Sequence, residues 1–369
     1  MSVQSLSLDG FLSSELGAHL ADAERMLRTA PPVVCDADAM QFLKLHYGCD
    51  AQVRSLSGER DRNFLATGSN GWSGILKFYN SADDADMRAL QNGVLSHVST
   101  CSTECPVPEI IPSLQGHQEV IADVNGVTLA AILLTRLPGV SPRPEDCGHA
   151  LRRTLGRTVG QLLQALKGYQ PAEAKRTILW DMSLVAELRP LCALVENRAR
   201  QEALSHWLNR FSTTIRPLTA RLAHQTIHND LSLSNILVDP IDHSIITGVI
   251  DFGDVVHAPR IHEFAIAASY FIGEVQDPIV AMADIIKGIG PELRLVRAEI
   301  ALLPELVRAR LATRILLSGW RAQLFPENRV YILRSNLSAW ALWERLDAFS
   351  PAELSDFLVE NCIGEFDEN

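Results

Sequence analysis

The chain has 369 residues and a formal net charge of −11, with 47% hydrophobic and 21% charged residues. This balance is typical of a globular chain with two or three domain-sized units. The acidic surplus argues against a nucleic-acid-binding or membrane-binding surface, because either would need basic stripes. We find no apolar run of membrane-spanning length and no signal-peptide pattern, so we expect a cytoplasmic protein.

Residues 1–33 predict a short amphipathic lead helix, because Leu12, Leu16 and Leu20 recur near helical spacing. A second short helix is expected from Asp38 to Tyr47, where Gly48 ends it. The next segments are rich in β-branched and aromatic residues, and they predict strands over residues 51–56, 63–67 and 74–79.

Three residues in these strands and loops are candidates for nucleotide binding. Gly58 lies in a polar loop where backbone amides could cover phosphates, and Arg60 adds positive charge. Lys77 interrupts an apolar strand, as a phosphate-binding lysine does in kinases. The alternative for Lys77 is an edge-strand lysine that faces water. The alternative for Gly58 is an ordinary turn glycine.

A phosphate-binding lysine of this kind normally pairs with a glutamate on the following helix. The helix expected over residues 85–98 contains no glutamate. Asp86 in its first turn is our candidate partner, although helix-dipole charge alone favours an acid there. Gln91 is the neutral alternative.

The composition changes at Pro138, after two further strands expected over residues 118–124 and 128–137. We place a lobe boundary here, which gives an N-lobe over residues 34–137 and a C-lobe over residues 138–369. Backbone groups near Thr135 and Leu137 could then bind the edge of a purine. A linker without ligand contacts is the alternative.

The C-lobe is predicted to be mostly helical, apart from the stretch from His228 to Asp254. Within it, two β-branched runs flank the turn Asp239–His243, which predicts a hairpin. The hairpin would bring Asn235, before its first strand, close to Asp251, after its second. The expected helices cover residues 148–166, 182–199, 201–224, 260–272, 278–287, 291–317 and 328–346.

This stretch carries the spacing of a kinase catalytic loop followed by a metal loop. The first motif runs from His228 through Asp230 to Asn235, and the second is Asp251-Phe252-Gly253. Asp230 is the candidate base, since a carboxylate can accept the proton of an attacking hydroxyl. Asn235 and Asp251 supply oxygens of the kind that Mg²⁺ prefers. No activation segment or A-P-E motif follows, which favours a small-molecule acceptor over a protein acceptor.

These motifs resemble the aminoglycoside phosphotransferase/choline kinase family. The runs Ser57–Phe64, Val249–Val255 and Phe264–Ala267 are most similar to the hydroxylysine kinase-like branch. The resemblance implies an α+β, two-lobed protein kinase-like fold, with an antiparallel N-lobe sheet and one helix. A mostly helical C-lobe would carry the catalytic hairpin. One departure is Asn229, where many members have glycine; asparagine tolerates left-handed backbone better than other residues do.

The resemblance implies a kinase that uses Mg²⁺ and either ATP or GTP. Its acceptor would be a small amino alcohol, with 5-hydroxylysine as our best hypothesis. Asp254 could hold the substrate ammonium or a second metal, or cap the loop. The candidates for the substrate carboxylate are Arg260, Arg308 and Arg314, and the alternative for each is a solvated surface arginine. The alternatives are an aminoglycoside, homoserine or choline-type acceptor, or a nucleotide-binding pseudoenzyme.

Overall fold

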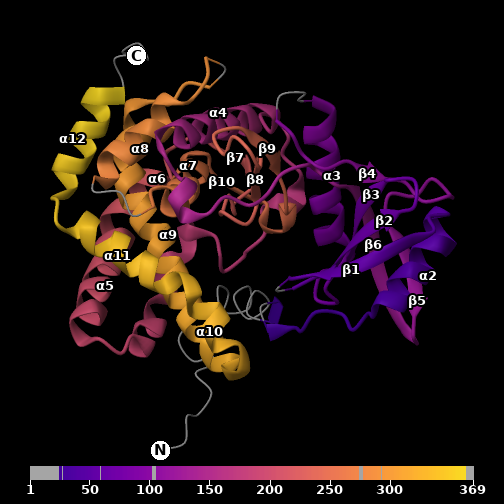
Figure 1. The fold of residues 1–369 in the computed structure, drawn as a ribbon. Helices are drawn as coiled ribbons and strands as arrows, with labels where there is room; N and C mark the ends of the chain where they lie inside the picture. The colour runs from indigo at the N-terminus through magenta and orange to yellow at the C-terminus, as the bar shows by residue number, and fades with distance from the viewer. Residues whose placement is uncertain are drawn as a thin grey trace, which may run out of the picture. The chain divides into compact units, whose positions relative to one another are not determined.

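A computed structural model describes residues 25–362, apart from residues 27, 59, 102–104, 274–276 and 292. The chain divides into two compact units, one formed by Arg25–Pro138 and the other beginning at Gly139 (Figure 1). We call them the N-lobe and the C-lobe. Most of the predicted lead helix over residues 1–33 lies outside the described residues. No helix in the described ranges is long and apolar enough to cross a membrane.

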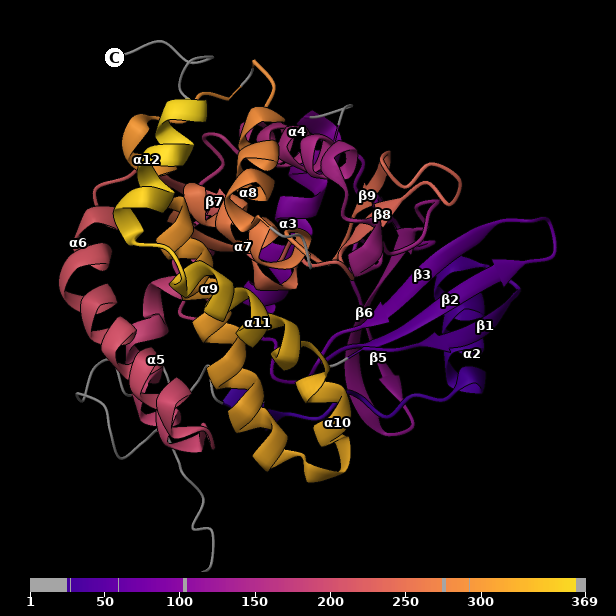
Figure 2. The same cartoon turned by 60° about the vertical axis from the view of Figure 1, so that its left-hand side comes forward.

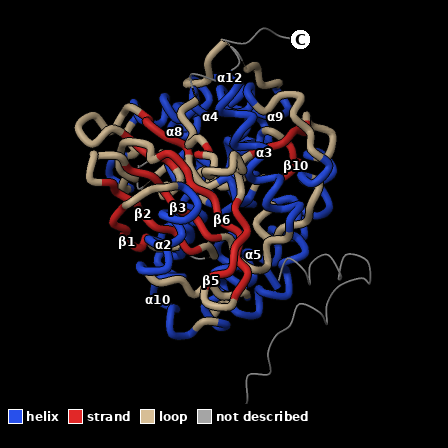
Figure 3. The backbone as a smooth tube through the Cα atoms, turned by 90° about the vertical axis from the view of Figure 1, so that its right-hand side faces the viewer, coloured by secondary structure: helices blue, strands red, loops and turns tan. Residues whose placement is uncertain are grey.

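The N-lobe is built on an antiparallel sheet with the strand order β1-β2-β3-β6-β4, in which β5 also pairs with β6 (Figure 3). The strands are β1 (Ala51–Leu56), β2 (Arg62–Gly68), β3 (Ser73–Phe78), β4 (Ile110–Ile111), β5 (Val120–Val124) and β6 (Val127–Thr135). At the turn between β5 and β6, Asn125 and Gly126 have φ values of 55° and 81°. Left-handed backbone at both residues suits a two-residue hairpin.

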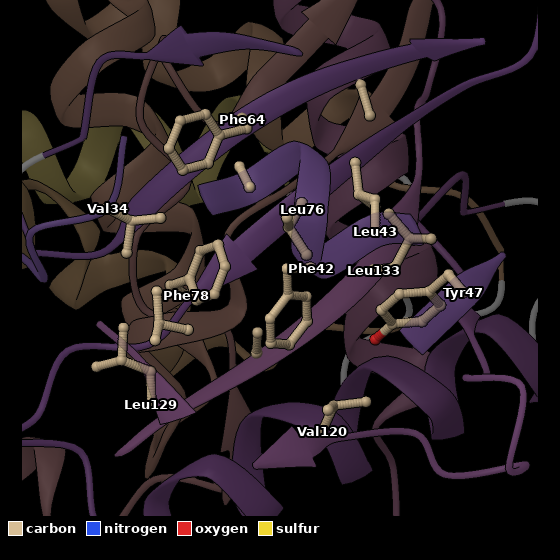
Figure 4. Close-up of a cluster of buried hydrophobic side chains, with 14 of the residues drawn as sticks. Val34, Phe42, Leu43, Tyr47, Phe64, Leu76, Phe78, Val120, Leu129 and Leu133 are labelled. Atoms are coloured by element: carbon tan, nitrogen blue, oxygen red, sulfur yellow. The ribbon is translucent and has the colours of Figure 1, made fainter. Parts of the chain in front are cut away.

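One face of this sheet packs against helix α2 (Asp36–Tyr47), which ends at the left-handed Gly48. Residues of β3 alternate between buried and half-buried, so that Leu76 and Phe78 face this core. Phe42 of α2 meets Phe78 with a ring-centroid distance of 4.9 Å (Figure 4). The same alternation turns Lys77 toward the opposite face, where helix α3 (Ala85–Cys101) supplies its neighbours.

The C-lobe is mostly helical, as the sequence predicts. Its α-helices are α4 (His149–Ala165), α5 (Arg198–Arg210), α6 (Arg216–Thr219), α7 (Ile261–Phe271), α8 (Pro278–Lys287), α9 (Arg297–Leu324), α10 (Arg329–Ile332), α11 (Asn336–Asp347) and α12 (Pro351–Cys362). Helix α9 is buried along most of its length and packs against α7, α11 and α12 (Figure 2). Helix α12 was not among the predicted helices.

Three predicted helices of the C-lobe differ from the structure. The helix predicted over residues 328–346 is interrupted by the 3₁₀ turn Leu333–Ser335, which separates α10 from α11. Residues 182–194 form 3₁₀ turns, because Pro190 removes a backbone donor and blocks a continuous α-helix. The helix predicted over residues 201–224 ends at Thr219, and strand β7 (His224–Ile227) follows it. Strand β7 pairs with β10 (Val256–Pro259) in a small antiparallel sheet beside the predicted motifs. Such short strands give little periodic signal in the sequence.

The predicted hairpin is confirmed. Strand β8 (Ile236–Val238) pairs antiparallel with β9 (Ile246–Val249), and Ile236 lies opposite Val249. Asp239 stabilises the turn by accepting two backbone N–H groups through its side chain. At the entrance to the C-lobe, Gly139 has a φ of 120°, and a Cβ atom there would lie 2.7 Å from the carbonyl oxygen of Val238. Only glycine allows the chain to pass so close to the hairpin.

Candidate active site

The catalytic-loop motif spans the connection between β7 and β8, and a buried glutamate of α7 fixes its start. Glu263 accepts the backbone N–H of His228 at 2.6 Å and that of Asn229 at 3.2 Å. Burial raises the pKa of the Glu263 carboxyl, and these backbone donors oppose that rise. Sequence reasoning missed Glu263, because the contact joins residues 35 positions apart.

His228 links the catalytic loop to the metal loop. Its Nε2 lies 3.1 Å from the carbonyl oxygen of Ile250, and its Nδ1 accepts the backbone N–H of Asp230 at 3.2 Å. A neutral imidazole protonated at Nε2 satisfies both contacts. The geometry therefore suits a bracing role for His228, since both ring nitrogens are occupied by the backbone.

Asn229 adopts the left-handed conformation, with a φ of 68°. Its side chain is fully buried, and neither amide atom has a hydrogen-bond partner among the described residues. The loop therefore accepts asparagine at a position whose backbone favours glycine, as expected. A buried polar side chain without partners also costs free energy.

The carboxylate of Asp230 is held from two sides. Its Oδ1 accepts Nη2 of Arg310 at 2.8 Å, and its Oδ2 accepts Nδ2 of Asn235 at 2.6 Å. About a quarter of the Asp230 side chain is exposed, whereas Arg310 is fully buried. The carboxylate is thus fixed in direction and still reaches the surface. Both properties suit a group that takes a proton from a substrate hydroxyl.

Arg310 was not among the predicted site residues. It lies on α9, 80 positions beyond Asp230, and its other terminal nitrogen donates to the carbonyl oxygen of Trp180 at 2.9 Å. Burial opposes its charge, while Tyr270, Asp230 and Asp254 favour it. In the sequence, Arg310 is one of several arginines in the segment that forms α9, and nothing there distinguishes it from Arg308 or Arg314.

The residues expected to bind Mg²⁺ pass a test of fit. Nδ2 of Asn235 donates both to the backbone oxygen of Asp230 at 2.9 Å and to its carboxylate. The amide oxygen Oδ1 of Asn235 therefore remains as an acceptor. The backbone N–H of Ile250 donates to the carbonyl oxygen of Asn235 at 2.9 Å, which brings Asp251 beside this amide.

Asp251 is exposed and has a φ of 66°. This left-handed backbone conformation is uncommon for a non-glycine residue and is often found at functional sites. Arg176 supports the loop by donating to the carbonyl oxygens of Gly253 at 2.6 Å and Val255 at 2.8 Å. In the described residues, no three His, Cys, Asp or Glu side chains form a metal cluster. One carboxylate and one amide nevertheless suit Mg²⁺, which keeps waters and substrate phosphates as its other ligands.

In the N-lobe, Lys77 lies on the central strand β3, not on an edge strand, and its side chain is only 11% exposed. Its Nζ forms an ion pair with Asp61 at 2.7 Å and donates to Oε1 of Gln91 at 3.4 Å. Asp86, the acid expected to pair with Lys77, is exposed in the first turn of α3. Gln91 lies five positions after Asp86 on this helix, which places their side chains about 140° apart around its axis.

The structure therefore corrects the pairing of Lys77 from Asp86 to Asp61, and it retains Gln91 as the neutral partner. It also gives Arg60 a different partner from the one expected. Arg60 forms an ion pair with Asp83, whose side chain is buried. Since Arg60 is committed to this acid at the start of α3, its charge is partly neutralised within the lobe.

The other predicted N-lobe residues lie near the ends of strands. Gly58 is exposed between β1 and β2, and a Cβ atom there would lie 2.8 Å from the carbonyl oxygen of Asp61, so the tight loop requires glycine. The backbone N–H of Thr135 donates to the carbonyl oxygen of Glu109 at 2.9 Å, which removes it as a donor to a purine. Leu137 is half-buried and follows the end of β6.

Two predicted substrate residues of the C-lobe differ in their availability. Asp254 is half-buried on the short 3₁₀ turn Phe252–Asp254, and its charge acts on Arg310. Arg260 instead forms a two-point ion pair with the buried Glu299 at 2.7 and 2.8 Å. Glu299 also accepts the backbone N–H of Val296 at the start of α9. Arg260 is thus engaged in an ion pair within the C-lobe, and its role in substrate binding stays a prediction.

The antiparallel N-lobe sheet, the helical C-lobe and the two fixed loops define a phosphotransferase of the protein kinase-like fold, one that acts on an alcohol group of a small molecule. The chain belongs to the phosphotransferase enzyme family (APH), whose profile matches residues 52–298. The predicted fold class and family resemblance are both confirmed.

Curated relatives include proteins named hydroxylysine kinase from several vertebrates. The Mus musculus protein is 22% identical over 342 residues, covering 86% of this chain and 90% of the relative. The Xenopus laevis protein is 23% identical over 336 residues, covering 85% and 90%. The resemblance to hydroxylysine kinases is therefore also confirmed.

Solved structures support the fold. An amicoumacin kinase in complex with AMP-PNP, Ca²⁺ and Ami has a TM-score of 0.63 and 18% identity, covering 88% of this chain and 94% of that one. A microcompartment-associated aminopropanol kinase has a TM-score of 0.58 and 20% identity, covering 89% and 98%. A choline/ethanolamine kinase family protein from Mesorhizobium loti has a TM-score of 0.59 and 14% identity, covering 88% and 98%.

Proposed function

We propose that this protein transfers the terminal phosphoryl group of a nucleoside triphosphate to the hydroxyl group of an amino alcohol, and that the acceptor is 5-hydroxylysine. The observation that carries the proposal is the carboxylate of Asp230, held between Arg310 and Asn235. The relatives named hydroxylysine kinase, which span most of this chain, support the choice of acceptor.

In the proposed reaction, the acceptor oxygen forms a bond to the terminal phosphorus, and the bond from that phosphorus to the bridging oxygen breaks. The products are a phosphate ester and a nucleoside diphosphate. Asp230 orients the acceptor hydroxyl and takes its proton, which then passes to solvent. Arg310 and Asn235 keep the carboxylate in place, so that little reorganisation is needed during transfer.

Asn235 and Asp251 would hold Mg²⁺ through the amide oxygen and the carboxylate. The ion supplies positive charge that neutralises the phosphate groups. In the N-lobe, Lys77 would bind nucleotide phosphates, with Asp61 and Gln91 setting the direction of its ammonium. Backbone amides near Gly58 would cover the phosphates, and ATP and GTP are both candidates as the donor.

The test is nucleotide turnover with ATP or GTP in the presence of a panel of amino alcohols, including 5-hydroxylysine, homoserine, choline and an aminoglycoside. We expect turnover with 5-hydroxylysine, and a loss of about 100-fold or more in Asp230→Ala, the range for removing a general base. Asp251→Ala should lose turnover and also bind the Mg²⁺–nucleotide complex more weakly. Asp242→Ala, which changes an exposed acid in the hairpin turn, is the matched control and should behave like the wild type.

Undiminished phosphotransfer by Asp230→Ala would refute the role of this residue. Turnover with another member of the panel and none with 5-hydroxylysine would move the proposal to that acceptor class. Nucleotide binding without turnover on any acceptor would identify the protein as a pseudoenzyme.

A further inference from the structure

Arg314 is a buried arginine of the C-lobe that lacks an acidic partner. It lies one helical turn beyond Arg310 on α9 and is only 6% exposed. Among the described residues, no carboxylate forms an ion pair with it, and its one hydrogen bond runs from Nη1 to the carbonyl oxygen of Ser269 at 3.0 Å. By contrast, the buried Arg152, Arg308 and Arg310 each have an aspartate partner.

An uncompensated buried charge is unfavourable, because a guanidinium loses its hydration and gains no counter-charge. Burial accordingly lowers the pKa of Arg314, and the neighbouring charge of Arg310 adds to that shift, whereas Tyr270 and the more distant carboxylate of Asp230 oppose it. The ring of Tyr270 lies 4.1 Å from the guanidinium carbon, which gives a cation–π contact. This contact stabilises the cation, and within the described part of the chain only Nη1 of the guanidinium donates a hydrogen bond.

The position of Arg314 connects it to the candidate active site. Arg310 also faces the ring of Tyr270, at 5.9 Å, and Arg310 donates directly to Asp230. Helices α7 and α9, which carry these residues, pack against each other. Two guanidinium groups therefore share one aromatic ring, and only one of them is neutralised by the candidate base.

We propose that Arg314, supported by Tyr270, binds the carboxylate of the acceptor and so selects a hydroxylated amino acid over the corresponding amino alcohol without a carboxylate. This inference rests on the proposed function and adds the substrate feature that Arg314 recognises. A planar guanidinium with free donors matches a carboxylate in shape as well as in charge. Arg314 acts as a specificity residue, whereas Arg310 positions the base.

The first test compares two acceptors with the wild-type enzyme: 5-hydroxylysine and its decarboxylated counterpart, which keeps both amines and the hydroxyl. We expect kcat/KM to be at least about tenfold higher for the acceptor with the carboxylate, because removing the carboxylate removes a charged hydrogen-bond partner of Arg314. In Arg314→Met, kcat/KM for 5-hydroxylysine should fall by roughly 30-fold or more. The value for the decarboxylated acceptor should be unchanged.

A stability measurement separates specificity from a structural role. Arg314→Met removes an unpaired buried charge, so its thermal midpoint without ligand should equal or exceed that of the wild type. The matched variant Arg308→Met removes an arginine of the same helix that pairs with Asp347, and its midpoint should fall. Arg308→Met should also keep the wild-type preference between the two acceptors.

A direct binding experiment distinguishes failure of this inference from failure of the proposed function. Lysine keeps the carboxylate and lacks the hydroxyl, so the wild type should bind lysine more tightly than its decarboxylated diamine, and Arg314→Met should lose this difference. If that binding difference is present but no acceptor is phosphorylated, the proposed phosphotransfer is overturned and the carboxylate site stands. Equal use of both acceptors by the wild type, or an equal loss on both in Arg314→Met, would overturn the inference.

Discussion

The most quantitative prediction concerns His262, which lies beside Glu263 on α7. Its side chain is 1% exposed, and neither ring nitrogen has a hydrogen-bond partner among the described residues. Burial, together with the charge of His224, lowers its pKa to about 3. The ring is therefore neutral in the folded protein at neutral and mildly acidic pH.

In the unfolded chain, the pKa of a histidine is about 6.5. Between that value and the folded-state value of about 3, the unfolded state binds a proton that the folded state excludes. The free energy of unfolding therefore falls as the pH drops below about 6.5. At about pH 5, roughly 1.5 pH units below the unfolded pKa, the loss from His262 alone is about 2 kcal/mol.

The assay is urea unfolding of wild type and His262→Leu at about pH 7.5 and pH 5. Tryptophan fluorescence reports mainly on the C-lobe, because all tryptophans except Trp72 follow Gly139. The stability lost between the two pH values should be about 2 kcal/mol smaller in the variant. The variant should also be at least as stable at about pH 7.5, since two buried nitrogens without partners are removed.

His206→Leu is the control, because His206 is exposed on α5. Burial raises the pKa values of two other acids, the buried Glu263 and the half-buried Asp181, but both remain in the two proteins and cancel in the comparison. If His262→Leu loses as much stability between the two pH values as the wild type does, then His262 is not a neutral histidine with a lowered pKa, and the reasoning is refuted.

Three further predictions concern the supports of the site and the helix packing. Glu263→Ala leaves two buried backbone donors unsatisfied, so it should cost about 2–4 kcal/mol in urea unfolding and reduce turnover; an unchanged midpoint would contradict the bracing role. Asn229→Gly should retain turnover, and its free energy of unfolding should rise by about 1 kcal/mol, seen as a higher thermal midpoint. The reason is that the substitution relieves left-handed strain and removes an unsatisfied amide. Lower stability of that variant would show that the Asn229 side chain contributes to packing. Gly156→Ala should destabilise by about 3 kcal/mol or more in thermal unfolding, because its Cβ would lie 1.8 Å from the carbonyl oxygen of Ile285. Gly319→Ala on α9 meets no atom within 4 Å and should be neutral or stabilising, and equal effects of the two glycine variants would exclude close helix packing as the cause.

Much of the fold was determined by local sequence signals. Alternating burial set the strands of the N-lobe, and the predicted bounds of β1 agree with the structure at both ends. The hairpin at β8 and β9 was predicted from two β-branched runs around a turn, and the antiparallel pairing of the two strands is confirmed. These signals succeed because strand alternation and turn chemistry depend on residues close together in the chain.

The tertiary structure decided which charged groups meet. Asp86 and Asp61 were both available to Lys77, and only the packing of α3 and the loop after β1 selected Asp61. The arginines of α9 look alike in the sequence, yet Arg308 pairs with Asp347 and Arg310 with Asp230, while Arg314 has no acidic partner among the described residues. Partners more than 30 residues apart leave no periodic pattern, because the register between packed helices and loops fixes them.

The sequence by itself therefore determined the class of chemistry. The fixed spacing from His228 to Asn235, followed by Asp251, places the candidate base and the two candidate metal ligands at one end of a hairpin whatever the surrounding helices do. Only the tertiary structure supplied the surroundings of that base: Glu263 beneath the loop and Arg310 against the carboxylate. Local spacing specifies the reacting groups, and long-range packing determines how they are held and what charge lies beside them.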